Sequence, residues 1–198
     1  MAIRKAGEVK VDLSGQVVTG QVPPNFKSSV IARIRESKFG PSNSSGLPQI
    51  TLGCEILIPE RILSDVDGKQ YDLTSVPVKI YLTLSDKDKK GNPSDGLNYI
   101  IEELLPRLGL PAEIDDENPL KSDSNPNGIP FDGMLIEVLV SSKERKEQRQ
   151  NPVTKQYEVI KDSRGNEITK GWEWNMVDKR DILGLATIGQ AVAESRPV

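Results

Sequence analysis

The chain has 198 residues, a net charge of −3 and an isoelectric point near 5.2. This length fits one domain with a substantial core, and the charge shows that the protein as a whole is not a basic nucleic-acid coat. Histidine is absent and there is one cysteine, which excludes Ser/His/Asp and Cys/His catalysis, His-ligated zinc and CxxC redox chemistry.

The chain opens without an apolar leader, and no apolar run is as long as a membrane span. We therefore expect a soluble, cytoplasmic protein without membrane contact. The composition of SGQVVTGQVPPN favours an extended N-terminal arm over residues 1–25. The predicted domain covers residues 26–180, and residues 181–198 form a C-terminal tail.

Two strands with a long polar loop between them are predicted for residues 27–58. In SSVIARIRE, apolar residues alternate with Arg33 and Arg35, which is the period of two of a half-buried strand. QITLGCEILI predicts a second strand whose apolar face includes Cys54 as a buried, reduced thiol. The Ser, Gly and Pro residues of SKFGPSNSSGLP predict a loop over residues 37–48.

The period changes after a third strand. VPVKIYLTL alternates apolar residues with polar ones and puts Tyr81 on the outward phase. Apolar residues then recur at helical spacing over residues 97–108, with Ser94 as a cap and Gly109 as a stop. These patterns predict one helix directly after the third strand.

The last third of the chain contains strands separated by polar segments. DGMLIEVLVSS alternates as a fourth strand, and a polar connector is expected over residues 142–156. KQYEVIK and GWEWNMV are strand-like with a DSRG turn between them, which predicts a protruding hairpin leading into the last strand. DILGLATIGQAVAESRPV is expected to form a short helix or a loosely docked tail.

Three strands, a helix and further strands is the element order of the OB-fold. The predicted fold class is therefore mainly β, a five-stranded OB-fold-like barrel with one helix after strand three and a β-hairpin extension. An OB-fold binds ligands on strands two and three and on two loops, which here are residues 37–48 and 142–156. We expect these two loops to lie side by side.

Charge is segregated along the chain in a way that fits a binding face. Residues 1–38 contain seven Lys/Arg and three Asp/Glu, and residues 143–180 contain ten and seven. Residues 102–123 contain two and seven. An acidic protein could thus present a positive track to phosphates.

Single-strand binding combines cations with aromatic rings on which bases stack. Phe39 in the first loop favours a binding role, whereas Trp172 and Trp174 fit either the core or a stacking platform. Arg33 and Arg35 are equally typical of a solvated strand face. The candidate nucleic-acid-binding residues are Lys27, Arg33, Arg35, Lys38, Phe39, Tyr81, Lys143, Arg145, Lys146, Arg149, Tyr157, Trp172 and Trp174.

The stretch SSVIARIRESKFGPSNSSGLPQITLGCEIL resembles the opening of single-stranded-DNA-binding proteins encoded by bacteriophages. GMLIEVLVSSKE and QYEVIKDSRGNEITKGWEWNMV are similar to the later half of that family. The resemblance covers residues 26–180. It implies an OB-fold that binds single-stranded DNA in phage replication or recombination, in the host cytoplasm and with replication or recombination proteins as partners.

Two other classes of function compete with this interpretation. Carboxylates at residues 86–88 or 115–117 could hold magnesium for phosphoryl transfer, but solvated loops explain them better. A structural or adaptor protein, for example a virion component that binds other proteins through strands, fits the short strands and Pro/Gly loops equally well. We expect DNA binding without enzymatic activity, metal or cofactor.

Overall fold

The computed structural model describes residues 17–115, 117–152 and 154–187, and it is built mainly from β-strands. The main sheet contains β1 (Lys27–Pro41), β2 (Pro48–Ile58), β5 (Val78–Thr83), β6 (Leu135–Lys146), β9 (Thr169–Trp174) and β10 (Ile182–Leu185). Two small hairpins are formed by β3 (Arg61–Leu63) with β4 (Gln70–Asp72), and by β7 (Gln148–Gln150) with β8 (Tyr157–Val159). The helical elements are α1 (Gly96–Tyr99), a π-helical turn (Ile100–Leu104), α2 (Leu105–Arg107) and 3-10 turns at Leu73–Ser75 and Lys179–Asp181.

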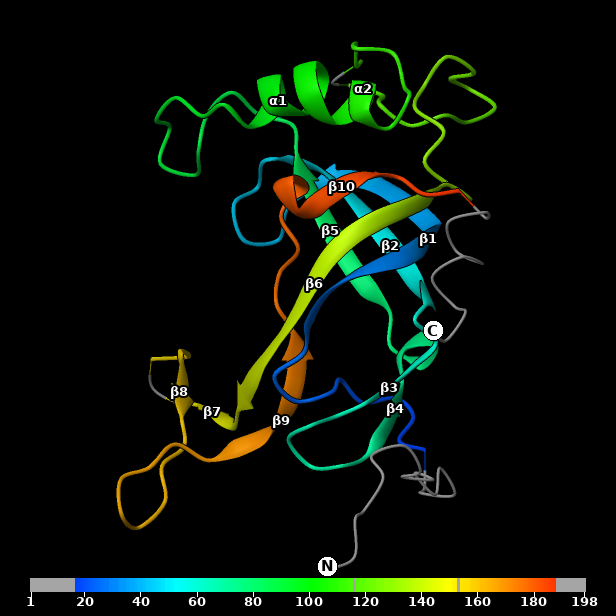
Figure 1. Ribbon diagram of the computed structural model, residues 1–198. Helices are drawn as coiled ribbons and strands as arrows, with labels where there is room; N and C mark the ends of the chain where they lie inside the picture. The colour runs from blue at the N-terminus through cyan, green and yellow to red at the C-terminus, as the bar shows by residue number, and fades with distance from the viewer. Residues whose placement is uncertain (1–16, 116, 153, 188–198) are drawn as a thin grey trace, which may run out of the picture.

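The main sheet is an open antiparallel sheet with the strand order β10-β6-β1-β2-β5. The first half of β6 pairs with β1 and β10, and its second half leaves the sheet as a ribbon paired with β9 (Figure 1). An isolated parallel bridge joins Ile80 of β5 to Val177 in the β9–β10 connector. The mainly β fold with a helix between the third and fourth long strands is thus confirmed.

The inner face of the sheet forms one hydrophobic core because apolar and polar residues alternate along its strands. Ile50, Leu52 and Cys54 of β2 are buried, and they face the buried Ile80 and other apolar residues of β5. Burial raises the pKa of the Cys54 thiol to about 12. This confirms the predicted role of the cysteine as an apolar core side chain.

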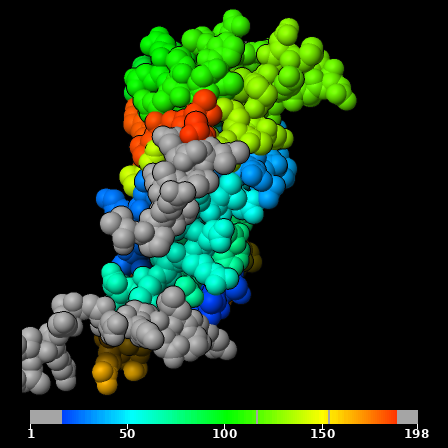
Figure 2. All heavy atoms as spheres, turned by 45° about the vertical axis from the view of Figure 1, so that its right-hand side comes forward, coloured from blue at the N-terminus to red at the C-terminus, as the bar shows by residue number. Residues whose placement is uncertain are grey.

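The helical segment 96–107 covers one end of the sheet (Figure 1). The space-filling view shows it, in green, at one end of an elongated molecule (Figure 2). The predicted apolar stripe is buried against the sheet at Ile100, Leu104, Leu105 and Leu108. Gly109 has φ +68°, a left-handed conformation that glycine adopts without strain, so the predicted stop is confirmed.

The β1–β2 hairpin has a shorter loop than predicted. Residues 38–41 continue β1 and pair with residues 48–51 of β2, so that only residues 42–47 form the turn. The N–H of Ser42 donates to the carbonyl of Leu47 at 2.8 Å and closes this turn. Ser, Gly and Pro indicate turns in general, but here the prolines stand at the strand ends, where a missing N–H is tolerated.

β6 is longer than the sequence indicates. The connector expected over residues 142–156 begins as a strand, because residues 142–146 pair with β9. Residues 142–146 are polar on both faces, so no apolar alternation marks this part of β6 in the sequence.

The N-terminal limit of the folded part lies before residue 26. The N–H of Val18 donates to the carbonyl of Gln70 at 2.8 Å, and Val18 forms a parallel bridge with Tyr71 of β4. Val22 is buried. The described part of the predicted arm is therefore packed against the β3–β4 hairpin, while residues 1–16 lie outside the described residues.

The C-terminal limit also differs from the prediction. Residues 182–185, expected as part of a helix or tail, form β10 at the edge of the sheet, and Ile182 is fully buried. A strand of four residues is too short to show a periodicity that would distinguish it from a helix. Residues 188–198 lie outside the described residues.

Candidate nucleic-acid interface

The outer face of β2 and β5 carries a row of polar side chains around one tyrosine. Because successive side chains of a strand point to opposite faces, the residues between the buried ones point outward. Thr51 of β2 lies opposite Tyr81 of β5, and Gln49 lies opposite Thr83. Lys79 lies opposite Gly53, and the side chain of Glu36 from β1 lies over that glycine, with its Cγ 3.0 Å from where a Cβ would be.

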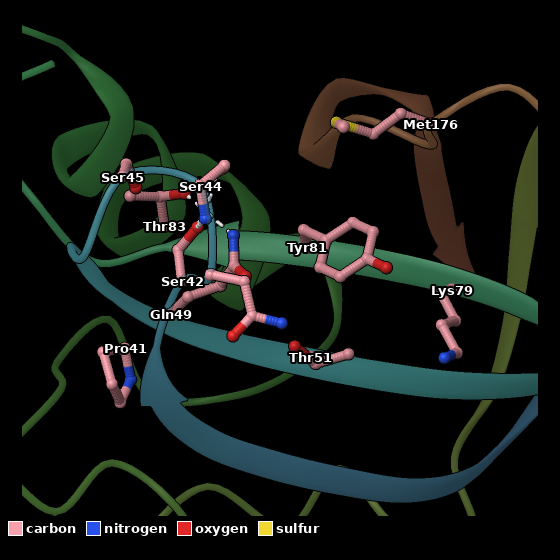
Figure 3. A pocket seen from close by; sticks show the side chains of 11 residues that line it. Pro41, Ser42, Ser44, Ser45, Gln49, Thr51, Lys79, Tyr81, Thr83 and Met176 are labelled. Carbon is pink, nitrogen blue, oxygen red and sulfur yellow. Dashed lines mark hydrogen bonds between the residues drawn. The ribbon is translucent and has the colours of Figure 1, made fainter. Parts of the chain in front are cut away.

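A groove of about 530 Å³ lies over this face. Its floor is the outer face of β2 and β5, one wall is the turn at residues 42–45, and the other is Met176 (Figure 3). We call it the β2–β5 groove, and it is lined by Pro41, Ser42, Asn43, Ser44, Ser45, Gln49, Thr51, Lys79, Tyr81, Thr83 and Met176. Figure 3 shows Tyr81 in the middle, with the serines on one side and Met176 on the other.

Most of the residues lining this groove were not among the predicted site residues. Lys79 has the same outward parity as Tyr81 in VPVKIYLTL, so the alternation could have found it. Met176 is 75% exposed and is held at the groove by its neighbour Val177, which is buried and bridged to Ile80. No local sequence signal predicts that long-range contact.

Three predicted cations lie on the adjacent outer face of β1. Arg33 lies opposite Glu55 of β2 and Lys38 lies opposite Thr51, so both share the outward face of the sheet. Arg35 also points to this face, because its Nε donates to Glu55 at 2.5 Å. The fold therefore puts Arg33, Arg35 and Lys38 on the same outer face of the sheet as Tyr81, although none of the three lines the β2–β5 groove.

These cations differ in how far they are neutralised. Arg35 is ion-paired with Glu55, and Lys38 with Glu36 at 2.8 Å. Arg33 and Lys79 form no ion pair within the described parts of the chain. The positive charge that is free to meet a phosphate on this face thus comes mainly from Arg33 and Lys79.

Phe39 and Lys27 lie apart from this group. Phe39 is opposite Ile50, whose side chain is buried, so Phe39 is on the inner side of the hairpin, where it is 37% exposed. Lys27 is the exposed first residue of β1 and lies opposite Ser141 of β6.

Lys143 and Lys146 lie on the ribbon formed by β6 and β9. Lys143 pairs with Glu173 at 3.4 Å, and Lys146 pairs with Glu144 and with Glu167. The hydrogen bond from Lys146 lowers the pKa of the Glu144 carboxyl. Acids on the same ribbon therefore neutralise these two predicted cations.

Arg149 and Tyr157 lie on the β7–β8 hairpin, away from both faces of the main sheet. Arg149 is opposite Glu158, and Tyr157 is 69% exposed opposite Gln150. Figure 1 shows this hairpin and the turn at residues 42–47 at different levels of the molecule. The two predicted loops are not side by side, because the β6–β9 ribbon carries the hairpin away from the sheet.

Trp172 and Trp174 line a second groove of about 510 Å³, between the ribbon and the β3–β4 region. We call it the tryptophan groove, and it is lined by Gly20, Gln21, Val22, Tyr71, Val76, Arg145, Lys170, Gly171, Trp172, Glu173 and Trp174. Trp174 packs edge-on against Phe26 with ring centroids 5.7 Å apart, and it borders the hydrophobic core. Its buried Nε1 has no hydrogen-bond partner among the described residues.

The carboxylates of the two acidic clusters accept hydrogen bonds within their own loops. Asp88 accepts hydrogen bonds from the side chain and backbone N–H of Asn92, and these bonds lower the pKa of its carboxyl. Asp115 accepts from the N–H of Glu117 at 3.0 Å, and Asp116 lies outside the described residues. Within the described ranges, no three His, Cys, Asp or Glu residues are grouped so that they could hold a metal ion.

In the part of the chain that the structure describes, no helix has both the length and the apolar character needed to cross a membrane. No protein-family model, curated protein or solved structure matches the chain. Function must therefore be inferred from the two grooves and the charges around them.

Proposed function

We propose that the protein binds single-stranded DNA in the β2–β5 groove without preference for base sequence. One observation carries this proposal: a single groove contains an aromatic ring, Tyr81, and a cation, Lys79, that forms no ion pair with any residue the structure describes. Single-strand binding requires rings on which bases stack and cations that follow the phosphates, and stacking tolerates any base because each base has a flat face.

The strand order supports the OB-fold-like barrel expected from the sequence. If β1, β2, β5, β6 and the β9–β10 segment are counted as five strands, the helix follows the third. The bridge between Ile80 and Val177 joins the third strand to the fifth, which is the contact that closing the sheet requires. The second and third strands would then be β2 and β5, whose outer face is the ligand surface of an OB-fold.

The proposed binding mechanism has two components. Arg33 and Lys79 attract phosphates and release their counterions, which gives affinity without sequence readout. A base then stacks on Tyr81, and the exposed Met176 packs on its other side from the facing wall. The hydroxyl and amide groups of residues 42–45 donate hydrogen bonds at the rim. No metal or cofactor takes part.

The resemblance to phage single-stranded-DNA-binding proteins supports the same function and extends it to DNA replication or recombination. In those processes the protein would cover DNA strands that have been separated. Its sequence-tolerant chemistry suits that task, because the bound sequence changes continually.

The adaptor function remains a second candidate because of the edge strand β10. Leu183 and Leu185 on this strand are each 46% exposed, and an exposed apolar edge can accept a strand from another protein. An adaptor would not bind oligonucleotides with an affinity that depends on salt, which separates the two candidates.

The test is a titration of the protein with an oligothymidylate of about 20 nucleotides, longer than the usual site of one OB-fold. We expect binding at low salt that weakens steeply as salt rises. Lys79→Ala should reduce the slope of log affinity against log salt by about one. Lys121→Ala removes an exposed lysine from the loop beyond the helix and should leave the slope unchanged. Absence of binding at low salt would rule the function out.

A further inference from the structure

The tryptophan groove combines aromatic rings with cations, and none of its lining residues is shared with the β2–β5 groove. Trp172 is half-buried on its wall, and Arg145 and Lys170 line the same groove. Neither cation forms an ion pair within the described residues, whereas Glu173 in this groove is paired with Lys143. The groove therefore has unpaired positive charge beside an accessible indole.

The ribbon has two backbone irregularities beside this groove. Arg145 lies opposite Gly171, which has φ +135° and no side chain, and a register shift follows between Arg145 and Lys146. The opposite wall is held by hydrogen bonds. The N–H of Gly20 donates to Ser75 Oγ at 2.8 Å, and the hydroxyl of Tyr71 donates to Asp67 at 2.8 Å.

We propose that the tryptophan groove is a second contact site for the single strand bound in the β2–β5 groove. In this site a base stacks on Trp172, and its flanking phosphates contact Arg145 and Lys170. The inference rests on the proposed function and deepens it, because it extends the bound strand from one groove to two.

The two grooves adjoin along the chain. Trp174 lines one groove and Met176 lines the other, so their Cα atoms are at most about 7 Å apart. A single strand rises about 3.4 Å per nucleotide when its bases are stacked, so a few nucleotides span the distance between these two lining residues.

The charge of the groove favours a nucleic acid over the chain's own N-terminal residues as its occupant. Residues 1–16 contain Arg4, Lys5 and Lys10 against Glu8 and Asp12, which leaves a net charge of +1. A cationic segment does not complement Arg145 and Lys170, whereas a phosphate backbone does.

The experiment uses the protein's own fluorescence. The chain has two tryptophans, and both line the tryptophan groove, whereas the β2–β5 groove has none. The full chain is titrated with an oligothymidylate of about 20 nucleotides, and binding is measured by gel mobility shift while tryptophan emission is recorded in parallel. We expect quenching that saturates together with the shift.

Two variants identify the contacts. Trp172→Ala should weaken binding by about 5- to 150-fold. The double variant Arg145→Ala/Lys170→Ala should lower the salt slope by about 1.4, and it is the decisive variant if Trp172→Ala fails to fold. Lys121→Ala is the matched control and should change neither quantity.

The outcomes separate this inference from the proposed function. A normal mobility shift without quenching, with unchanged affinity and slope in these variants, would overturn the second site and leave the first intact. The same result, together with altered tryptophan emission in free protein that lacks residues 2–16, would mean that the N-terminal residues and not DNA occupy the tryptophan groove. A chain that shifts no oligonucleotide would disprove both proposals.

Discussion

The β2–β5 groove and the tryptophan groove have almost the same volume, about 530 and 510 Å³, but they are built differently. The first lies on a sheet whose other face is the hydrophobic core, and one turn and one methionine form its walls. The second lies between a two-stranded ribbon and a small hairpin. One groove thus has its aromatic ring on the main sheet, and the other has its tryptophan rings on the β6–β9 ribbon that leaves the sheet.

The comparison also shows how an acidic protein can carry local positive charge. Several cations near each groove are neutralised, such as Arg35 by Glu55 and Lys143 by Glu173. Lys79 in one groove, and Arg145 and Lys170 in the other, form no ion pair among the described residues. The pattern of ion pairs, rather than the net charge of −3, decides where a phosphate would bind.

The largest expected effect separates the two tryptophans of the tryptophan groove. Trp174→Ala removes a ring that packs on Phe26 and the core, and should lower the free energy of unfolding by about 3 kcal/mol. Trp172→Ala removes a ring on the groove wall and should cost less than about 1 kcal/mol. Chemical denaturation of both variants checks this difference. Equal losses would mean that Trp172 is also a core residue.

A smaller effect is expected in the β2–β5 groove, and it concerns affinity rather than stability. Tyr81→Ala should weaken binding of an oligothymidylate by about 1 to 3 kcal/mol, because a stacking ring is lost. Tyr81→Phe keeps the ring and should bind nearly as the unmodified protein does. The two variants are compared by mobility shift at one salt concentration. If both lose affinity equally, the hydroxyl of Tyr81 and not its ring makes the contact.

The long strands could be predicted from the sequence because each has one buried face. The alternation in VPVKIYLTL follows directly from the burial of Ile80 and its neighbours, and the same parity puts Tyr81 outside. The β3–β4 hairpin and β10 have three or four residues per strand, too few for a period to appear. The second half of β6 was missed because its residues 142–146 are polar on both faces, whereas its partner β9 includes part of the predicted strand GWEWNMV.

The sequence predicts site residues only where the alternation along one strand determines which face a side chain points to. Arg33 and Arg35 were placed correctly on the outer face, but the pairing of Arg35 with Glu55 depends on the register of two strands and on a bulge between Ile34 and Glu36. Met176 reaches the groove through a contact between residues far apart in the chain. The sequence shows which side chains point outward, and long-range pairing decides which of them meet.

The smallest expected effect contrasts the two groove tyrosines. Tyr81 lies in the open β2–β5 groove, whereas Tyr71 is a buried part of the tryptophan groove wall, and burial together with its bond to Asp67 raises its pKa to about 12. Its ordinary pKa is about 10, so above pH 10 the unfolded chain loses this proton before the folded protein does. The folded state is then progressively destabilised between pH 10 and 12, by about 1.4 kcal/mol per pH unit from this group.

Tyr71→Phe tests that contribution. At pH 7 the variant should be less stable by about 1 kcal/mol, because the hydrogen bond to Asp67 is lost. Its disadvantage should shrink as the pH rises from 10 and should reverse before pH 12, since phenylalanine has no proton to lose and Cys54 affects both proteins alike. Urea denaturation of both proteins across this range measures the difference. A constant gap would mean that Tyr71 ionises as readily in the folded protein as in the unfolded chain, and that this wall of the tryptophan groove is open to solvent.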